Sequence, residues 1–196
     1  MSEILVNTIK KADGTGSITV PAETGTVLTS GTALTSFPSG FANGITEYDM
    51  YRLTNGTGFS NQDIMTGPLE RVDTDNFEKI GTGVSESSGI FTLPSTGYWK
   101  ITMFGQFTSG GVRNYVGVRI DQSVDSGSNY DSLANAYGNI GNNNAYAQAI
   151  ATGLVKITNA STARIRVAFE MDNDCTVVGS TGSNFTYIEF IKIGEV

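Results

Sequence analysis

Most of the side chains that enzymes use for nucleophilic or metal chemistry are missing from this sequence. It contains no histidine and a single cysteine, Cys175. A Ser-His-Asp or Cys-His pair therefore cannot form, and zinc sites that need imidazole or several thiolates are excluded. Cys175 has no basic neighbour in sequence that would lower the pKa of its thiol, so we expect a small and unreactive side chain.

Carboxylates are the groups that remain for acid–base or cation chemistry. Paired carboxylates can hydrolyse glycosidic bonds, but solvated surface charge is the commoner role of such residues, and the acidic sets here are Glu47/Asp49, Asp125/Asp131 and Glu170/Asp172/Asp174. Asp172 and Asp174 form a candidate calcium site, because adjacent loop carboxylates supply the oxygen ligands that calcium takes. They lack the rest of a calcium-binding loop, so we rank calcium below ordinary turn chemistry. We predict a protein that is not an enzyme and has no cofactor.

Tyrosine and asparagine are concentrated in residues 122–146. Ser, Asn and Gly are also frequent there, which predicts the longest loop of the domain. Mixtures of Tyr, Asn and Ser are typical of adaptable binding surfaces, and tyrosine rings stack on sugars. A host glycan is therefore one candidate ligand, while subunit contacts or simple loop packing would explain the same residues, which are Tyr130, Tyr137, Asn142, Asn143 and Tyr146.

The elements that hold these residues are predicted to be strands. The chain has 196 residues with 24 Gly and 16% charged residues, a composition typical of short strands and tight turns. The net charge of −7 and the pI near 4.5 argue against nucleic-acid binding, because phosphate contacts need clustered Lys and Arg. No apolar run is long enough to cross a membrane, and the N-terminus lacks the apolar core of a secretion signal. We therefore expect neither membrane insertion nor Sec-type export.

The clearest strand signal is the segment 89–107, in which a Pro-Ser-Thr-Gly turn separates two stretches of β-branched and aromatic residues. Tyr98 and Phe104 share one face of the second stretch. Large aromatics on a face that also carries polar residues indicate contact with another copy of the chain. The opposite face is assigned to the core and carries Trp99, Ile101 and Met103.

The C-terminal segment 184–193 is apolar on both faces, which predicts a central strand beside the one just described. Alternation predicts the remaining strands less distinctly, and a turn is expected at 55–58. The other predicted strands are residues 48–53, 63–72 with a bend, 77–80, 115–121, 147–157 and 164–171.

Residues 1–46 differ from the globular domain predicted at 47–196 and are expected to form an extended β-arm and a linker. Short strands are predicted around an Asp-Gly-Thr-Gly turn, and they are too short to bury a core alone. A partly disordered tail is the alternative, but strand-type alternation favours an arm that pairs with a larger assembly. The predicted anchoring residues are Ile4, Leu5, Val6, Ile9, Ile18 and Val20.

Two segments, SSGIFTLPSTGYWKI (87–101) and NFTYIEFIKIG (184–194), resemble the hallmark strands of jelly-roll domains of the C1q and tumour-necrosis-factor type. The matching residues are Phe91, Pro94, Gly97 and Tyr98 in the first segment, and Phe185, Tyr187 and Phe190 in the second. The resemblance covers roughly residues 47–196 and implies an all-β jelly-roll β-sandwich that assembles as a homotrimer through the aromatic face of its inner sheet. The interface residues implied in this way are Tyr98, Phe104, Phe185, Tyr187 and Phe190.

The segments ILVNTIKKADGTGSITVP (4–21) and DNFEKIGTGVSESSGIFTLP (75–94) further resemble bacteriophage head and tail fibre proteins and decoration proteins. This implies a virion protein made in the host cytoplasm, whose partners are copies of itself and a capsid or other virion protein. Because the chain has no long shaft repeat, we favour a capsid decoration protein or head fibre. The alternative is a receptor-binding adhesin at a tail-fibre tip that recognises a host surface glycan.

Overall fold

The computed structural model describes residues 8–10, 17–19, 44–74 and 77–196. The chain divides into two units, residues 1–41 and 42–196. In the first unit, β1 (Thr8–Lys10) and β2 (Ser17–Thr19) pair in antiparallel fashion with Ile9 opposite Ile18. The other predicted anchoring residues lie outside the described residues: Ile4, Leu5, Val6 and Val20.

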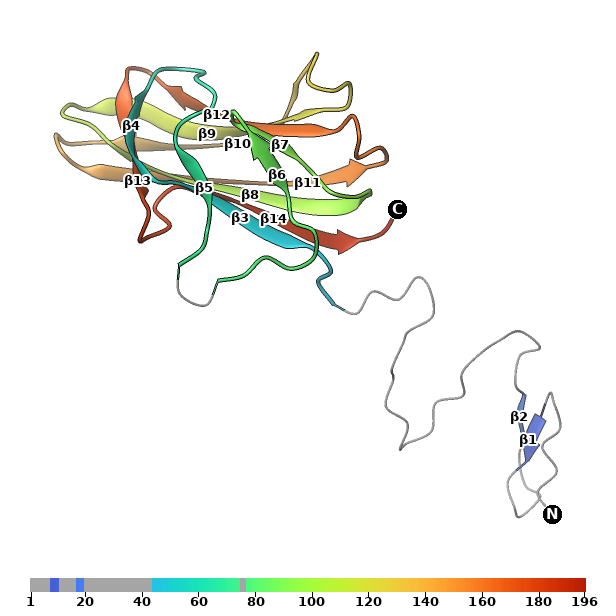
Figure 1. Cartoon of the computed structure of the whole chain (residues 1–196). Coiled ribbons are helices and arrows are strands. Elements are labelled where there is room, and N and C mark those ends of the chain that lie inside the picture. Colours follow the sequence, from blue (N-terminus) through green and yellow to red (C-terminus); the bar gives the residue numbers. More distant parts are fainter. Residues whose placement is uncertain (1–7, 11–16, 20–43, 75–76) are drawn as a thin grey trace. The chain divides into compact units, whose positions relative to one another are not determined.

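The second unit is a sandwich of two antiparallel sheets, and its described residues form strands but no helix (Figure 1). One sheet has seven strands: β3 (Tyr48–Leu53), β4 (Asn55–Phe59), β5 (Leu69–Arg71), β8 (Gly97–Thr108), β11 (Tyr146–Ile157), β13 (Cys175–Ser180) and β14 (Tyr187–Gly194). The other has five: β6 (Ser85–Ser87), β7 (Ile90–Thr92), β9 (Arg113–Ser123), β10 (Asp131–Ile140) and β12 (Arg164–Met171). Within the described part of the chain, there is no helix that could span a membrane.

The long strand β8 organises the seven-stranded sheet. On one side β11 pairs with β8 along its whole length, and on the other side the order is β14, β3 and β5. Near the C-terminal end of β8, β13 pairs with β8 on the same side as β14. The other edge of β13 pairs with β4. The predicted pairing of β8 with the C-terminal strand is confirmed, since Ile188 lies opposite Met103 and Phe190 opposite Ile101.

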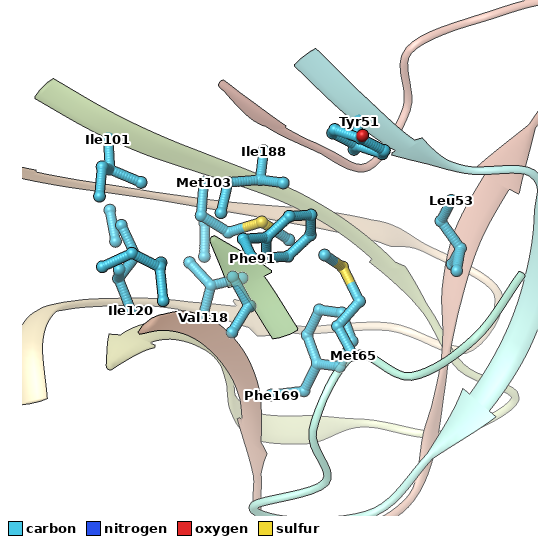
Figure 2. Packing of buried hydrophobic residues seen from close by; sticks show 14 of the residues in the cluster. Tyr51, Leu53, Met65, Phe91, Ile101, Met103, Val118, Ile120, Phe169 and Ile188 are labelled. Atoms are coloured by element: carbon cyan, nitrogen blue, oxygen red, sulfur yellow. The ribbon is translucent and has the colours of Figure 1, made fainter. Parts of the chain in front are cut away.

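The core lies between the two sheets. Alternation along β8 turns Trp99, Ile101 and Met103 inward, as predicted, and these three and Phe107 are fully buried. Figure 2 shows Ile101 and Met103 facing Val118 and Ile120 of β9, with Phe91 of β7 among them. Fully burying a side chain of this kind contributes about 1.5–3 kcal/mol. The core therefore fixes which face of β8 remains outside.

The two sheets come close together where β10 meets β11. A Cβ atom on Gly138 of β10 would lie 2.7 Å from the backbone oxygen of Gln148, and one on Gly153 of β11 would lie 2.6 Å from the Leu133 side chain. Facing sheets are ordinarily about 10 Å apart, so small residues are needed for this closure. The inward face of β11 accordingly carries Ala147, Ala149, Ala151 and Gly153 at successive positions.

The prediction of one loop over 122–146 is wrong in its middle, because residues 131–140 form β10. This strand pairs with β9, with Ala134 opposite Ile120 and Tyr137 opposite Gly117. Its small and polar residues suit a strand packed closely against β11, and they mimic the composition of a loop. Two register shifts, 132/134 and 138/140, mark bulges in the strand.

Residues 55–59 and 77–80 also differ from the predictions. The segment predicted as a turn is strand β4, which pairs with β13. This pairing requires Gly179, because a Cβ atom there would lie 2.3 Å from the Asn55 backbone oxygen. In place of the predicted strand 77–80, Ile80 forms an isolated bridge with Tyr48. Of the predicted strand 63–72, only residues 69–71 form a strand, β5.

Candidate functional site

The outward surface of the seven-stranded sheet carries large apolar and aromatic side chains, interspersed with polar ones, on four neighbouring strands, β3, β14, β8 and β11. Antiparallel pairing places its side chains in rungs across the strands. The first rung is Arg52, Tyr187, Phe104 and Ile150, the second is Met50, Glu189, Thr102 and Thr152, and the third is Tyr48, Ile191, Lys100 and Leu154. We call these residues, together with Tyr98, the outer face.

Large apolar side chains of the outer face are exposed. The rings of Phe104 and Tyr187 stack with their centroids 5.4 Å apart and their planes at 9°. Ile150, opposite Phe104 on β11, is 57% exposed, and Leu154 is 58% exposed. Contiguous exposed apolar surface is uncommon on monomeric proteins and marks interaction sites.

Two pairs of polar side chains on the outer face hydrogen-bond to each other. The Tyr48 hydroxyl donates to Glu189 Oε1 at 3.0 Å, and the Thr152 hydroxyl donates to Thr102 Oγ1 at 3.3 Å. Burial, and then the hydrogen bond to Glu189, raise the pKa of the Tyr48 hydroxyl, so it stays protonated as a donor. A partner can therefore cover these hydroxyls without leaving them unpaired.

The structure places the five residues predicted to contact other copies in different environments. Tyr98, Phe104 and Tyr187 lie on the outer face, and Phe185, which precedes β14, is 39% exposed. The prediction for Phe190 is wrong, because alternation along β14 turns this residue inward. Its ring is fully buried and lies 5.2 Å from that of Phe91.

Sequence reasoning missed the outward residues of β11. Ile150 and Leu154 alternate with Ala and Gly in AYAQAIATGLVKI, and the larger apolar residues of a strand ordinarily face the core. Here the small residues face inward, because β10 packs closely on that side. The signal that could have found these residues is the regular alternation of small with large apolar side chains.

The predicted ligand residues do not form one site. Tyr130 precedes β10, whereas Asn142 and Asn143 follow it, so the 10 residues of β10 separate them, which corresponds to roughly 30 Å of extended chain. Tyr146 begins β11 in the other sheet and is 65% exposed. Tyr137 lies on the outward surface of the five-stranded sheet, where its ring contacts that of Tyr115 at a centroid distance of 6.0 Å.

Asp172 and Asp174, the predicted calcium pair, make separate local contacts. Asp172 Oδ2 accepts a hydrogen bond from the Asn114 backbone N–H at 2.8 Å. The Asp174 backbone carbonyl accepts two from the Arg113 guanidinium, at 2.7 and 3.1 Å. No group of three or more His, Cys, Asp or Glu side chains is placed to hold a metal ion among the residues that the structure describes. The fold therefore brings no third carboxylate to this pair.

Glu47 and Asp49, another acidic pair from the sequence, hold the β-sandwich together. Asp49 is fully buried, and its carboxylate accepts hydrogen bonds from Arg71 Nε at 3.0 Å and from the Val84 backbone N–H at 2.7 Å. Glu47 accepts a hydrogen bond from the Gly83 backbone N–H at 3.0 Å. Both carboxylates thus fix the segment before β6 onto β3.

No protein-family model matches the chain, and no curated protein sequence matches it either. The chain is similar in structure to murine APRIL at pH 5.0, with a TM-score of 0.55 and 14% identity over 75% of this chain and 98% of that one. It is also similar to the Eiger TNF from S. frugiperda, with a TM-score of 0.59 and 7% identity over 76% of this chain and 93% of that one. At these identities the likeness concerns the fold. The described residues 44–74 and 77–196 therefore adopt a jelly roll of the tumour-necrosis-factor type, as the two hallmark segments predicted.

Proposed function

We propose that this protein is a non-enzymatic structural protein that assembles as a homotrimer through its outer face. We further propose that it belongs to a bacteriophage virion, as a capsid decoration protein or head fibre, with residues 1–46 as the anchor. The exposed apolar side chains of the outer face are the observation that supports the proposed trimer. The virion location is carried by the sequence resemblance of the segments 4–21 and 75–94 to phage structural proteins.

A second copy of the chain is the occupant that suits the outer face best. The face combines aromatic and aliphatic side chains with hydroxyl groups that are already hydrogen-bonded within the chain. Removing apolar surface from water contributes about 25 cal/mol per Å², and a stable interface buries about 800 Å² on each partner. The outer face spans four strands, and the resemblance to C1q and tumour-necrosis-factor domains implies threefold symmetry.

A substitution in the outer face tests the assembly. Ile150→Glu places a carboxylate between Phe104 and the partner chain, where burying an unpaired charge costs several kcal/mol. We expect light scattering to give three times the chain mass of 20.8 kDa for the unaltered protein and the mass of one chain for the variant. Val124→Glu is the matched control, because Val124 is 68% exposed in the loop between β9 and β10, and it should leave the mass unchanged.

Two results of this measurement would contradict the proposal. A single-chain mass for the unaltered protein would mean that the outer face does not join copies of this chain. An Ile150→Glu variant of unchanged mass would place the interface elsewhere. The virion location has a separate test, which is electron microscopy of phage particles labelled with antibodies against this protein. Unlabelled particles would contradict the location and leave the assembly standing.

A further inference from the structure

The outward surface of the five-stranded sheet carries a chain of connected polar and aromatic side chains that the proposed assembly does not use. It begins at Tyr137 of β10, whose hydroxyl donates to Glu170 Oε2 on β12. Glu170 Oε1 accepts from Arg119 of β9. These contacts join three adjacent strands into one polar surface.

The same network continues along β9 to a second aromatic residue. Arg119 donates to both carboxylate oxygens of Asp121, at 2.7 and 3.2 Å, and Arg166 Nε donates to Asp121 Oδ2 at 3.0 Å. The Arg166 guanidinium lies 3.8 Å from the centroid of the Tyr130 ring. We call Glu170, Arg119, Asp121 and Arg166 the polar strip, which has Tyr137 at one end and Tyr130 at the other.

The Tyr137 end of the polar strip is hollowed. Tyr115, Tyr137 and Glu170 line an open depression of about 370 Å³, a size typical of small-ligand sites. Tyr137 is 54% exposed and Tyr115 is 37% exposed, and their rings meet edge to face at 83°. Two amphipathic rings beside a fixed carboxylate provide an apolar surface and an orienting polar group in one place.

The position of Tyr137 is fixed by its neighbours. A Cβ atom on Gly117 would lie 2.5 Å from Cδ1 of Tyr137, so the ring lies directly over a glycine on the adjacent strand. The 138/140 register shift follows immediately, and bulges of this kind redirect side chains near functional sites. The ring is therefore held in place before any ligand binds, which lowers the entropic cost of binding.

The polar strip retains hydrogen-bonding capacity. Arg119 uses three N–H groups in the contacts given above, and a guanidinium has five. Each carboxylate oxygen of Glu170 can accept a second hydrogen bond. Hydroxyl groups, which both donate and accept, can use these positions together.

The charge of the polar strip and of the whole chain favours neutral over anionic ligands that carry several hydroxyl groups. The two guanidinium groups of the polar strip are balanced by the two carboxylates of Asp121 and Glu170, and the whole chain carries −7. An anionic ligand would meet no excess positive charge on this surface and would be repelled by the chain as a whole.

We infer that the depression at Tyr115, Tyr137 and Glu170 binds a neutral hexose oligosaccharide, with a sugar ring stacked on the Tyr137 ring and its hydroxyls bonded to Glu170 and Arg119. The site lies within one protomer, on the sheet opposite the outer face, and so does not depend on the proposed trimer. It would give the protein the glycan contact that an adhesin needs.

The test is a glycan microarray that carries neutral hexose oligosaccharides beside sialylated and sulfated ones, probed with the full chain. Retention on neutral oligosaccharides is expected, with Tyr137→Ala weakening it about two- to tenfold, since one aromatic stacking contact is worth about 0.5–1.5 kcal/mol. Glu170→Gln should also weaken retention, and it serves as the second variant if Tyr137→Ala fails to fold. Tyr146→Ala, an exposed tyrosine on the other sheet, is the matched control and should bind as the unaltered chain does. Retention on charged glycans alone, no retention on any neutral oligosaccharide, or full retention by both site variants would overturn the inference.

Discussion

Cys175 illustrates how the surroundings of one side chain set its chemistry. Its thiol is buried at the start of β13, with Sγ 3.5 Å from the Met171 sulfur. Burial is the main cause that raises the pKa of the Cys175 thiol from 9.0 to about 11, and nearby Arg113 opposes the shift. The thiol therefore stays protonated at neutral pH, in line with the unreactive side chain expected from the sequence.

The raised pKa of Cys175 predicts a loss of stability in alkaline solution. The folded chain holds this proton more tightly than the unfolded chain, so the stabilisation is complete below pH 9 and is lost as pH rises toward 11. Between pH 8 and pH 10.5 the contribution falls by about 2 kcal/mol. Urea unfolding at the two pH values should show a larger loss for the unaltered chain than for Cys175→Ala, which keeps the tyrosines that also titrate. An equal loss of unfolding free energy in the unaltered chain and in Cys175→Ala would mean that the Cys175 thiol does not cause the alkaline destabilisation.

Because β10 and β11 pack closely, we expect substitutions that change side-chain volume at Gly153 of β11 and Leu133 of β10 to be energetically coupled. Gly153→Ala would place a methyl group 2.6 Å from the Leu133 side chain, and overpacking of this kind costs about 1–3 kcal/mol. Leu133→Ala in the same chain frees the space for this methyl group. The double variant should therefore lose less free energy of unfolding than the two single variants lose together. Urea unfolding of the four proteins measures this coupling.

Gly58→Ala in β4 is the matched control for the exchange, because nothing lies within 4 Å of a Cβ atom there. It should change the free energy of unfolding by less than about 0.5 kcal/mol. Strict additivity of the Gly153 and Leu133 substitutions would mean that the two strands are not in the contact described here.

The strands that the sequence predicted well are those whose alternation records burial directly. In β8 and β3 most inward residues are large and apolar or tightly paired, so the period of two survives in the sequence. The sequence does not predict β10, because its close packing on β11 requires small residues, and Ala, Gly, Asn and Ser are also common in loops. Close packing against β10 also explains β11, in which small residues face the core while the larger Ile150 and Leu154 face outward. The sequence names Tyr137 as a candidate ligand residue, but its partners Glu170 and Arg119 come from strands that only the fold brings together.

The two sheets present opposite surfaces of different chemistry. The seven-stranded sheet exposes the apolar outer face, while the five-stranded sheet exposes the polar strip with its tyrosines. Assembly through the first surface leaves the second facing solvent. A trimer would then display three copies of the strip, and linked sites raise the apparent affinity for a repetitive ligand without new contacts.

The globular unit contains everything that the proposed trimer needs. Every member of the buried core cluster lies between Tyr51 and Phe190, and the outer face belongs to β3, β8, β11 and β14. A chain that begins at residue 44 should therefore keep the melting temperature and oligomer mass of the full chain while losing attachment to the virion. Light scattering, thermal melting followed by circular dichroism, and co-sedimentation with phage particles measure the three properties. A drop to single-chain mass would assign part of the interface to the first 43 residues, and retained co-sedimentation would show that attachment does not require them.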